Sequence, residues 1–270
     1  MRNISILSVL FLLTLGIQTT RAQKQNSATE GKGKIILHLP DHRTVEYNVG
    51  ELDSITYVNY ESKHRPPVSE PLNCPDNRHP HAIDLGLPSG TKWCCCNVDA
   101  TAPEGFGGYY AWGETEEKNM YFDVTYPYFS GQDTDGNGDI DENLSNINIG
   151  SDIAGTDYDV AHVRMGAPWR MPSKEQQDEL RYNCFSRWTQ QNGVSGYLLT
   201  GPNGRRIFLP AAGYRWKEFI NEAGWYGYYW SSSLYPYDNY YASTFGFYAY
   251  DWNWFYGRRN FGLSVRPVQQ

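Results

Sequence analysis

The chain has 270 residues, of which 40% are hydrophobic and 16% aromatic, and a formal net charge of -7. An acidic chain whose basic residues do not cluster binds the phosphate backbone poorly, so the sequence predicts no nucleic-acid partner. This length suffices for one domain of ordinary size and a small additional module, with enough residues to bury a hydrophobic core.

Residues 1–22 are typical of a secretory signal peptide. Arg2 begins a short basic region, residues 4–17 form an apolar run, and small residues occupy the cleavage positions before Gln23. The apolar run is too short for a comfortable membrane span, and no later run reaches that length. We therefore expect an exported protein, in the periplasm, at the cell surface or secreted, without membrane insertion.

Residues 33–60 are predicted to form a small β-module. Its strands would be GKIILHLP, TVEYNV and SITYV, and the second of these alternates apolar and polar residues as a half-buried strand does. A unit of this size cannot hold a core alone. Residues 61–73 are polar and rich in proline, so we expect them to form a semi-extended linker.

The main domain is expected over residues 74–270. Residues 82–87, 92–98 and 107–114 are predicted strands, because each is a short run rich in apolar and aromatic residues with turn-forming residues around it. The stretch that follows, residues 116–150, is polar and is predicted to be irregular.

One helix is predicted in this domain, beginning after Ser173 and running to Cys184. Ser173 is a candidate N-cap, and Gln176 stands three residues later, as in a capping box. Beyond the helix, two strands are predicted on either side of the turn GPNG. The chain closes with GLSVRPV, whose apolar residues alternate with polar ones as in a terminal strand.

The stretch from residue 225 to residue 261 has an unusual composition. Nearly half of its residues are aromatic, and almost all the others are Asn, Asp, Ser, Gly, Ala or Arg. Hydrophobic cores consist mainly of Leu, Ile and Val, whereas antigen-binding loops combine Tyr and Trp with small polar residues. The composition therefore predicts a recognition surface. The alternative is an aromatic-rich β-domain core with tyrosines at its surface.

Eight sequence blocks between residues 74 and 268 carry a resemblance to a known family. They are IDLGLPSGTKW, CCNV, GGYYAWGET, GTDYDVAHVRMGAPWRMPS, the predicted helix, GPNGRRIFLPAAGYRW, YGYYWSSS and GLSVRPV. In this order they resemble the Fibrobacter succinogenes major paralogous domain family. The resemblance implies an α+β, C-type-lectin-like domain whose two ends pair in a sheet and whose long loops carry binding. Residues 33–58 likewise resemble a β-module that often precedes such domains in exported bacterial proteins.

Residues 235–260 also resemble the variable region of C-type-lectin-like proteins that retroelements diversify. Such regions are rich in Tyr, Asn, Asp and Ser and precede the terminal strand. The resemblance implies a variable binding surface on a rigid scaffold, since loops tolerate variation where neighbouring strands hold them. The candidate ligand-binding residues are Tyr235, Tyr237, Asp238, Asn239, Tyr240, Tyr241, Tyr248, Tyr250, Asp251, Asn253, Trp254, Tyr256, Arg258 and Asn260.

Five cysteines in an exported chain predict disulfides, with one thiol left over. Cys94, Cys95 and Cys96 are consecutive, and adjacent cysteines rarely meet disulfide geometry, so their partners must come from Cys74 and Cys184. We expect Cys184 to pair with Cys95 or Cys96. The family resemblance leaves Cys94 unpaired, because Ala is expected there. A zinc site is the competing interpretation, but the spacing fits no familiar ligand pattern.

The string DTDGNGDIDEN is similar to a calcium-binding loop, and calcium is the one cofactor that the sequence suggests. Leu144 stands where such a loop has its bidentate Glu, and no predicted helix flanks it. A surface loop of Asx turns is the alternative explanation. The candidate ligands are Asp133, Asp135, Asn137 and Asp139.

The sequence predicts no catalytic residues. The serines at 231–233 lack a nucleophile-elbow pattern, and His79 and His81 flank a proline, where a solvated turn is the default. The sequence therefore predicts a non-catalytic protein that presents aromatic residues to a glycan or a cell-surface protein.

Two alternative functions stay open. The C-type-lectin-like fold includes formylglycine-generating oxidising enzymes, whose reactive cysteine pair Cys95 and Cys184 could imitate, although no matching motif surrounds them. The second alternative is a structural subunit of a surface fibre, in which the small module would pair with a neighbouring chain by strand addition.

Overall fold

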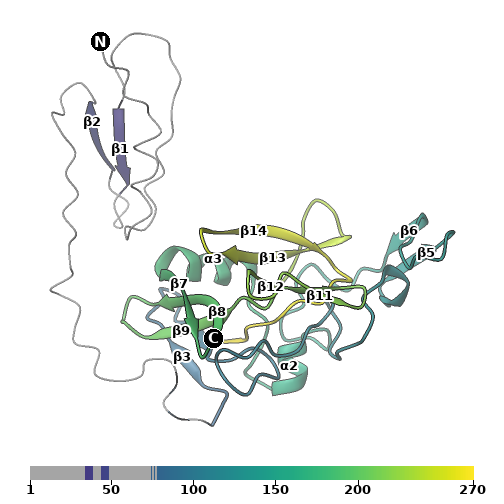
Figure 1. Ribbon diagram of the computed structural model, residues 1–270, viewed down its shortest axis with the longest axis horizontal. Helices are drawn as coiled ribbons and strands as arrows, with labels where there is room; N and C mark the ends of the chain where they lie inside the picture. The colour runs from purple at the N-terminus through teal and green to yellow at the C-terminus, as the bar shows by residue number, and fades with distance from the viewer. Residues whose placement is uncertain (1–33, 39–43, 49–73, 75, 77) are drawn as a thin grey trace. The chain divides into compact units, whose positions relative to one another are not determined.

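The computed structural model describes residues 34–38, 44–48, 74, 76 and 78–270. The chain divides into two compact units, residues 1–67 and 68–270, which are described separately below (Figure 1). The predicted signal peptide (1–22), the predicted linker (61–73) and the third strand predicted for the small module lie outside the described residues.

The first unit contains a β-hairpin. Strands β1 (Lys34–His38) and β2 (Thr44–Asn48) pair antiparallel, with Ile36 opposite Glu46. The β-branched residues in these runs favour extended backbone. The pairing confirms the first two strands predicted within residues 33–60.

The second unit consists mainly of strands arranged in five small antiparallel sheets, with two α-helices in its described part. This content is consistent with the predicted α+β class. The helical segments are α2 (Val160–Met165), α3 (Lys174–Asn183) and the single turn η2 (Asp123–Thr125). The strands are β3 (Ala82–Asp84), β4 (Lys92–Cys94), β5 (Phe129–Gln132), β6 (Glu142–Asn146), β7 (Phe185–Gln191), β8 (Val194–Thr200), β9 (Arg206–Pro210), β10 (Tyr214–Trp216), β11 (Phe219–Asn221), β12 (Tyr226–Leu234), β13 (Tyr241–Tyr248), β14 (Asp251–Arg258) and β15 (Val268–Gln269).

The beginning and the end of the second unit lie side by side in one sheet. Strand β15 pairs with β4, with Val268 opposite Trp93, and β4 pairs with β3. This arrangement confirms the expectation that the two ends of the domain pair. Strand β3 is shorter than the predicted run of residues 82–87, because Gly86 has a φ of 72°, outside the range of extended backbone.

Helix α3 begins as the sequence predicts. Ser173 Oγ accepts a hydrogen bond from the Gln176 backbone N–H at 3.3 Å, and Gln176 Oε1 accepts one from the Ser173 N–H at 3.0 Å. This reciprocal pair is a capping box, which satisfies two N–H groups at the helix start.

No helix in the described part of the chain is long and apolar enough to cross a membrane.

Helix α2 was not predicted, although its N-cap is strong. One carboxylate oxygen of Asp159 accepts hydrogen bonds from the N–H groups of Ala161 and His162, and the other accepts from Gly155 and Met171. An Asp placed directly before a short apolar run was the available signal.

Two further predictions have opposite outcomes. The hairpin around GPNG is present as β8 and β9, which pair antiparallel. The prediction of a strand at residues 107–114 is wrong, because Tyr110 is the one residue of this run that forms a β-bridge, and its partner is Leu263. Residues 116–150, predicted to be irregular, contain η2 and the β5–β6 hairpin.

The core contains many aromatic side chains. Trp93, Trp112 and Trp230 are among its largest fully buried residues. The indole N–H of Trp112 donates to the Ser231 carbonyl at 3.0 Å, and that of Trp230 donates to the Tyr110 carbonyl at 2.7 Å. Every such bond removes the cost of burying an unpaired polar group, which lets tryptophan serve as a core residue.

Candidate functional site

The sheet of β12, β13 and β14 carries most of the aromatic stretch, on two different faces. Because side chains alternate along a strand, neighbouring residues point to opposite sides of the sheet. Tyr229, Phe245 and Phe247 are buried in the core. Tyr226 and Tyr228 lie on the other, outer face and are only half-buried, with Tyr226 opposite Tyr248. The core interpretation therefore holds for one face, whereas the other is half-buried at Tyr226 and Tyr228 and fully buried at Trp230.

Seven aromatic rings form an unbroken row of contacts, and an eighth contacts the row from the side; we call these eight rings the aromatic track. Neighbouring ring centroids lie between 5.3 and 6.3 Å apart, a usual spacing for aromatic pairs. Tyr250, at one end, is 88% exposed, and Trp216, at the other, is 37% exposed. In order of contact, the track consists of Tyr250, Tyr248, Tyr226, Tyr228, Tyr214, Phe261 and Trp216, with Phe255 against Tyr228.

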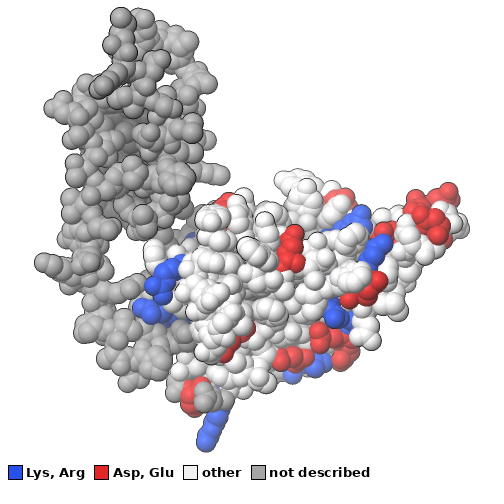
Figure 2. Space-filling model, in the orientation of Figure 1, with Lys and Arg blue, Asp and Glu red and all other residues white. Residues whose placement is uncertain are grey.

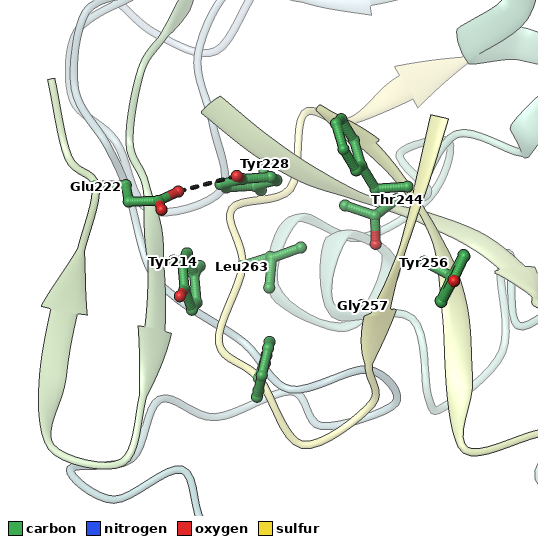
Figure 3. Close-up of a pocket in the computed structure, with 9 residues that line it drawn as sticks. Tyr214, Glu222, Tyr228, Thr244, Tyr256, Gly257 and Leu263 are labelled. Carbon is green, nitrogen blue, oxygen red and sulfur yellow. Dashed lines mark hydrogen bonds between the residues drawn. The ribbon is translucent and has the colours of Figure 1, made fainter. Parts of the chain in front are cut away.

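An open groove of about 220 Å³ lies along the middle of the track. Figure 3 shows one wall on the side of the β10–β11 hairpin and the other on the side of β13 and β14, with Tyr228 and Leu263 between them. The groove is lined by Tyr214, Glu222, Tyr228, Thr244, Phe255, Tyr256, Gly257, Phe261 and Leu263.

Two glycines allow the rings to lie this close to the sheet. A Cβ added at Gly246 would come within 2.5 Å of the Phe255 ring and 3.2 Å of the Tyr228 ring. A Cβ at Gly257 would come within 2.9 Å of the Trp230 ring. Glycine at these positions is therefore required by packing against aromatic side chains, since any larger residue would displace them.

The polar groups of the groove lie next to its aromatic walls. The Tyr228 hydroxyl donates to Glu222 Oε2 at 2.9 Å. Burial, and next the hydrogen bond to Glu222, raise the pKa of the Tyr228 phenol, so it stays a protonated donor at neutral pH. Burial also raises the pKa of Tyr214. The groove thus offers flat apolar faces, hydroxyl donors and one carboxylate acceptor.

A second group of tyrosines, which we call the loop cluster, lies beside the groove. Tyr256 stacks on Tyr235 with centroids 4.8 Å apart and contacts Tyr241 edge-on at 5.1 Å, while Tyr237 contacts Tyr235. Tyr237 is 87% exposed and Tyr256 is 56% exposed. Because Tyr256 also lines the groove, the loop cluster and the aromatic track form one connected surface.

Two of the predicted surface residues are buried, so their assignment to a binding surface is wrong. The Tyr240 ring stacks on Phe129 with centroids 4.6 Å apart, and its hydroxyl donates to the Asp123 carboxylate at 2.9 Å. Asn260 is fully buried, and its Nδ2 donates to the Tyr121 carbonyl at 3.4 Å. Each side chain donates to a buried acceptor, a contact that sequence composition cannot reveal.

Other predicted residues make local contacts. Asp238 accepts from the Tyr240 N–H, Asn239 accepts from the Asn146 side chain, and Asp251 accepts from the Trp252 N–H. The Arg258 guanidinium lies over the Tyr240 ring, 5.2 Å from its centroid. Asn253 belongs to strand β14 and lies opposite Gly246, whereas the side chain of Trp254 lies outside the described atoms. A binding role for these residues stays a prediction.

Of the groove-lining residues, the candidate list contains only Tyr256. It lacks Tyr214, Glu222, Tyr228, Thr244, Phe255, Gly257, Phe261 and Leu263. Tyr226, Tyr228 and Trp230 alternate along β12, which indicates one shared face. Because Trp230 on that face is fully buried, the alternation alone does not identify Tyr228 as a groove residue. No sequence pattern predicts that Tyr214 and Glu222 lie beside Tyr228. Tyr214 belongs to β10, and Glu222 directly follows β11.

The predicted calcium loop is held together by hydrogen bonds within itself. The Asp133 carboxylate accepts from the N–H groups of Gly136 and Gly138, each at 2.8 Å. The carboxylates that converge belong to Asp133, Asp135 and Asp141. Asp139 lies 3.5 Å from Lys217 Nζ, and calcium binding by the predicted ligands stays a prediction. Asx turns account for the local geometry.

The predicted disulfide from Cys184 to Cys95 or Cys96 is not formed, since all five cysteines are thiols in the structure. The Cys95 sulfur lies instead 3.5 Å from that of Cys96 and 3.4 Å from His79 Nδ1. Cys184 is buried at the end of α3, and burial raises its pKa to about 12. A thiol with such a pKa is a poor nucleophile at neutral pH.

Charges are scattered over the visible face of the second unit. Figure 2 shows a large uncharged area, with acidic side chains gathered at the tip that carries β5 and β6 and no large basic patch on that face. Phosphate binding requires clustered Lys and Arg, and the absence of a nucleic-acid partner stays a prediction.

Comparison of the chain with protein families, curated proteins and solved structures finds no match.

Proposed function

We propose that this chain is an exported, non-catalytic binding protein with a C-type-lectin-like domain, and that its aromatic track and groove bind a glycan. The observation that supports this function is the continuous row of ring contacts from Tyr250 to Trp216, with the groove at its middle. Sugar rings have flat apolar faces that stack on aromatic side chains, and their hydroxyls bind to polar groups at the ring edges.

The composition of the groove favours a sugar over a purely apolar ligand. Glu222 provides carboxylate oxygens at one wall, and the hydroxyls of Tyr214 and Tyr228 lie on the same side. Binding sites of this kind combine apolar walls with a few polar groups that fix the orientation of the ligand. A track longer than the groove suits an extended chain of several sugar units.

Two observations favour binding over catalysis. Glycoside hydrolysis generally requires a pair of carboxylates on either side of the scissile bond, whereas Glu222 is the single carboxylate among the groove-lining residues. An oxidising enzyme of the formylglycine-generating type requires a reactive cysteine pair. Burial raises the pKa of Cys184 to about 12, which disfavours the reactive thiolate.

Export and diversification belong to the same proposal. Export rests on the signal-peptide pattern of residues 1–22, and diversification rests on the resemblance of residues 235–260 to variable regions. Of the track rings, Tyr248, Tyr250 and Phe255 fall within residues 235–260, and so does the loop cluster. A diversified protein would thus vary the rim of the site while Tyr214 and Tyr228 stay constant. A near-copy of this coding segment, differing at adenines and adjacent to a reverse-transcriptase gene, is the expected genomic feature.

Glycan-array screening of the full chain, followed by calorimetry with the oligosaccharide identified, tests the proposal. Tyr228→Ala and Phe255→Ala should each weaken binding, whereas Tyr182→Ala should not. Tyr182 is a matched control because it is an aromatic residue on α3, 66% exposed and outside the track. Unchanged binding in both groove variants would overturn the site, and oxidation of a cysteine-containing peptide would support the enzyme instead.

A further inference from the structure

Four metal-ligating side chains converge near the start of the second unit. Cys74, His79, His81 and Cys95 each contribute one ligand atom to a group in which all atoms lie within 4.8 Å of one another. The His79 Nδ1 lies 3.5 Å from Cys74 Sγ and 3.4 Å from Cys95 Sγ. The His81 Nδ1 lies 3.7 Å from Cys95 Sγ. Two sulfur atoms and two imidazole nitrogens thus surround a common point.

The separations fit tetrahedral coordination of zinc. Zinc bonds of roughly 2.3 Å to sulfur and 2.0 to 2.1 Å to nitrogen, at the tetrahedral angle, place sulfur and nitrogen about 3.6 Å apart. Three of the four sulfur–nitrogen pairs lie 3.4, 3.5 and 3.7 Å apart, and the fourth, between Cys74 and His81, lies within 4.8 Å. Hydrogen bonding alone also brings thiols and imidazoles together, but it does not require four groups to face one point.

The backbone explains why residues distant in the sequence meet here. The Cys95 N–H donates to the His81 carbonyl at 2.9 Å, which continues the pairing of β3 with β4 beyond the strands themselves. His81 therefore lies beside Cys95. The His81 N–H in turn donates to Cys95 Sγ at 3.1 Å, a bond that stabilises negative charge on that sulfur.

A further contact orients one of the imidazoles. Asp76 Oδ1 lies 3.1 Å from His81 Nε2, the ring nitrogen opposite to the one that faces the cluster. Metal-binding histidines usually donate their second ring N–H to such a carboxylate, which fixes the tautomer and the orientation of the ring. This arrangement leaves the Nδ1 lone pair of His81 directed at the site.

We propose that Cys74, His79, His81 and Cys95 form a tetrahedral zinc site that fastens the segment before β3 to the end of β4. Two thiolates and two imidazoles suit zinc better than calcium or magnesium, which take oxygen ligands. Four protein ligands leave no position for water, so the site would be structural and not catalytic. The inference is independent of glycan binding, because none of these residues lines the groove.

The first experiment measures the zinc content of the full chain and the X-ray absorption of the bound metal. We expect one zinc per chain, with two sulfur neighbours at about 2.3 Å and two nitrogen neighbours at about 2.0 Å. Fewer than two sulfur neighbours, or no zinc uptake by the reduced protein, would overturn the proposal. A disulfide between Cys74 and Cys95 that persists in zinc-containing buffer would also overturn it.

The second experiment compares variants in competition with a chromophoric chelator. Cys74→Ser should abolish stoichiometric zinc binding. Asp76→Asn should lower zinc affinity about 10- to 100-fold, because it keeps all four ligands and removes only the negative charge of the group that accepts the His81 Nε2 hydrogen bond. Asp76 is exposed, so this variant keeps the test valid if Cys74→Ser fails to fold. Cys184→Ala, a buried cysteine outside the cluster, should bind zinc like the parent, and equal affinity in all variants would contradict the assignment.

Discussion

The Tyr228 hydroxyl donates a hydrogen bond to Glu222 Oε2 across 2.9 Å, which joins the outer face of strand β12 to the residue after β11. The same ring contacts Tyr214 at 5.5 Å and Phe255 at 6.0 Å between centroids. Tyr228 is therefore held by neighbours on several sides and presents a fixed aromatic surface to the groove. Such rigid rings lose little conformational entropy when a ligand binds.

Replacing Tyr228 should separate stacking from hydrogen bonding. Tyr228→Ala should raise the Kd for a bound oligosaccharide about tenfold or more, since loss of a central aromatic contact costs more than about 1 kcal/mol. Tyr228→Phe keeps the ring and loses the hydroxyl, so we expect roughly a threefold to tenfold weakening, in line with one net hydrogen bond of about 1 kcal/mol. Calorimetry measures both values. Equal Kd values for Tyr228→Ala and the parent protein would exclude the ring from the site.

Filling the space above Gly246 should block the groove without changing any polar group. An added Cβ would approach the Phe255 ring to 2.5 Å, so Gly246→Val should displace that ring, reduce binding and lower the free energy of unfolding by about 1 to 3 kcal/mol. Gly227→Ala is the matched comparison. Its Cβ would come within 2.2 Å of Phe247 on the buried face, so it should destabilise the fold while its folded fraction still binds.

Tyr240→Phe should make stability more dependent on pH. Burial raises the pKa of the Asp123 carboxyl, and the hydrogen bond from Tyr240 opposes that rise. A carboxyl whose folded-state pKa is raised contributes stability that is present below its unfolded pKa and is lost as the pH rises through the folded pKa. Without the Tyr240 donor the folded pKa rises further. The variant should therefore lose more stability than the parent as the carboxyl ionises.

Urea unfolding from about pH 4 to about pH 8 measures this difference. We expect a loss of about 1 kcal/mol where Asp123 is protonated and about 2 kcal/mol where it is ionised, because hydrogen bonds to charged groups are stronger. Tyr237→Phe is the control, since Tyr237 is 87% exposed and should show the parental profile. A penalty that shrinks with rising pH would contradict the role given to Tyr240.

Arg266 should be difficult to replace, even by lysine. It is 1% exposed, and its guanidinium donates to the carbonyls of Cys94, Cys95 and Phe208 and to Asn97 Oδ1. Lysine has three donors in a compact ammonium and cannot match this planar pattern. Arg266→Lys should lower the free energy of unfolding by about 3 kcal/mol, at about 1 kcal/mol for each lost bond.

Arg187→Lys serves as the control for this prediction, because Arg187 is an exposed residue of strand β7. Its substitution should change stability by less than about 0.5 kcal/mol. Thermal and urea unfolding measure both variants. Arg266→Lys with parental stability would show that the carbonyls find other donors.

Several elements could be predicted from the sequence, because the residues that define each of them are close together along the chain. Ser173 and Gln176 are three residues apart, and this spacing alone is sufficient to place their reciprocal bonds at the start of α3. The β8–β9 hairpin follows from two apolar runs around one turn. The strand predicted at residues 107–114 failed for the complementary reason, since its composition suits a strand but Tyr110 alone finds a bridging partner.

By itself, the sequence determined the local elements, the acidic character of the chain and the concentration of aromatic residues near its end. Only the tertiary structure decided which rings face outward, because a shift of one residue in the pairing of β12 with β13 would exchange Tyr228 for Tyr229. It also decided which groups meet. Glu222 reaches Tyr228 across the turn between β11 and β12, and His81 reaches Cys95 because the pairing of β3 with β4 continues beyond the strands.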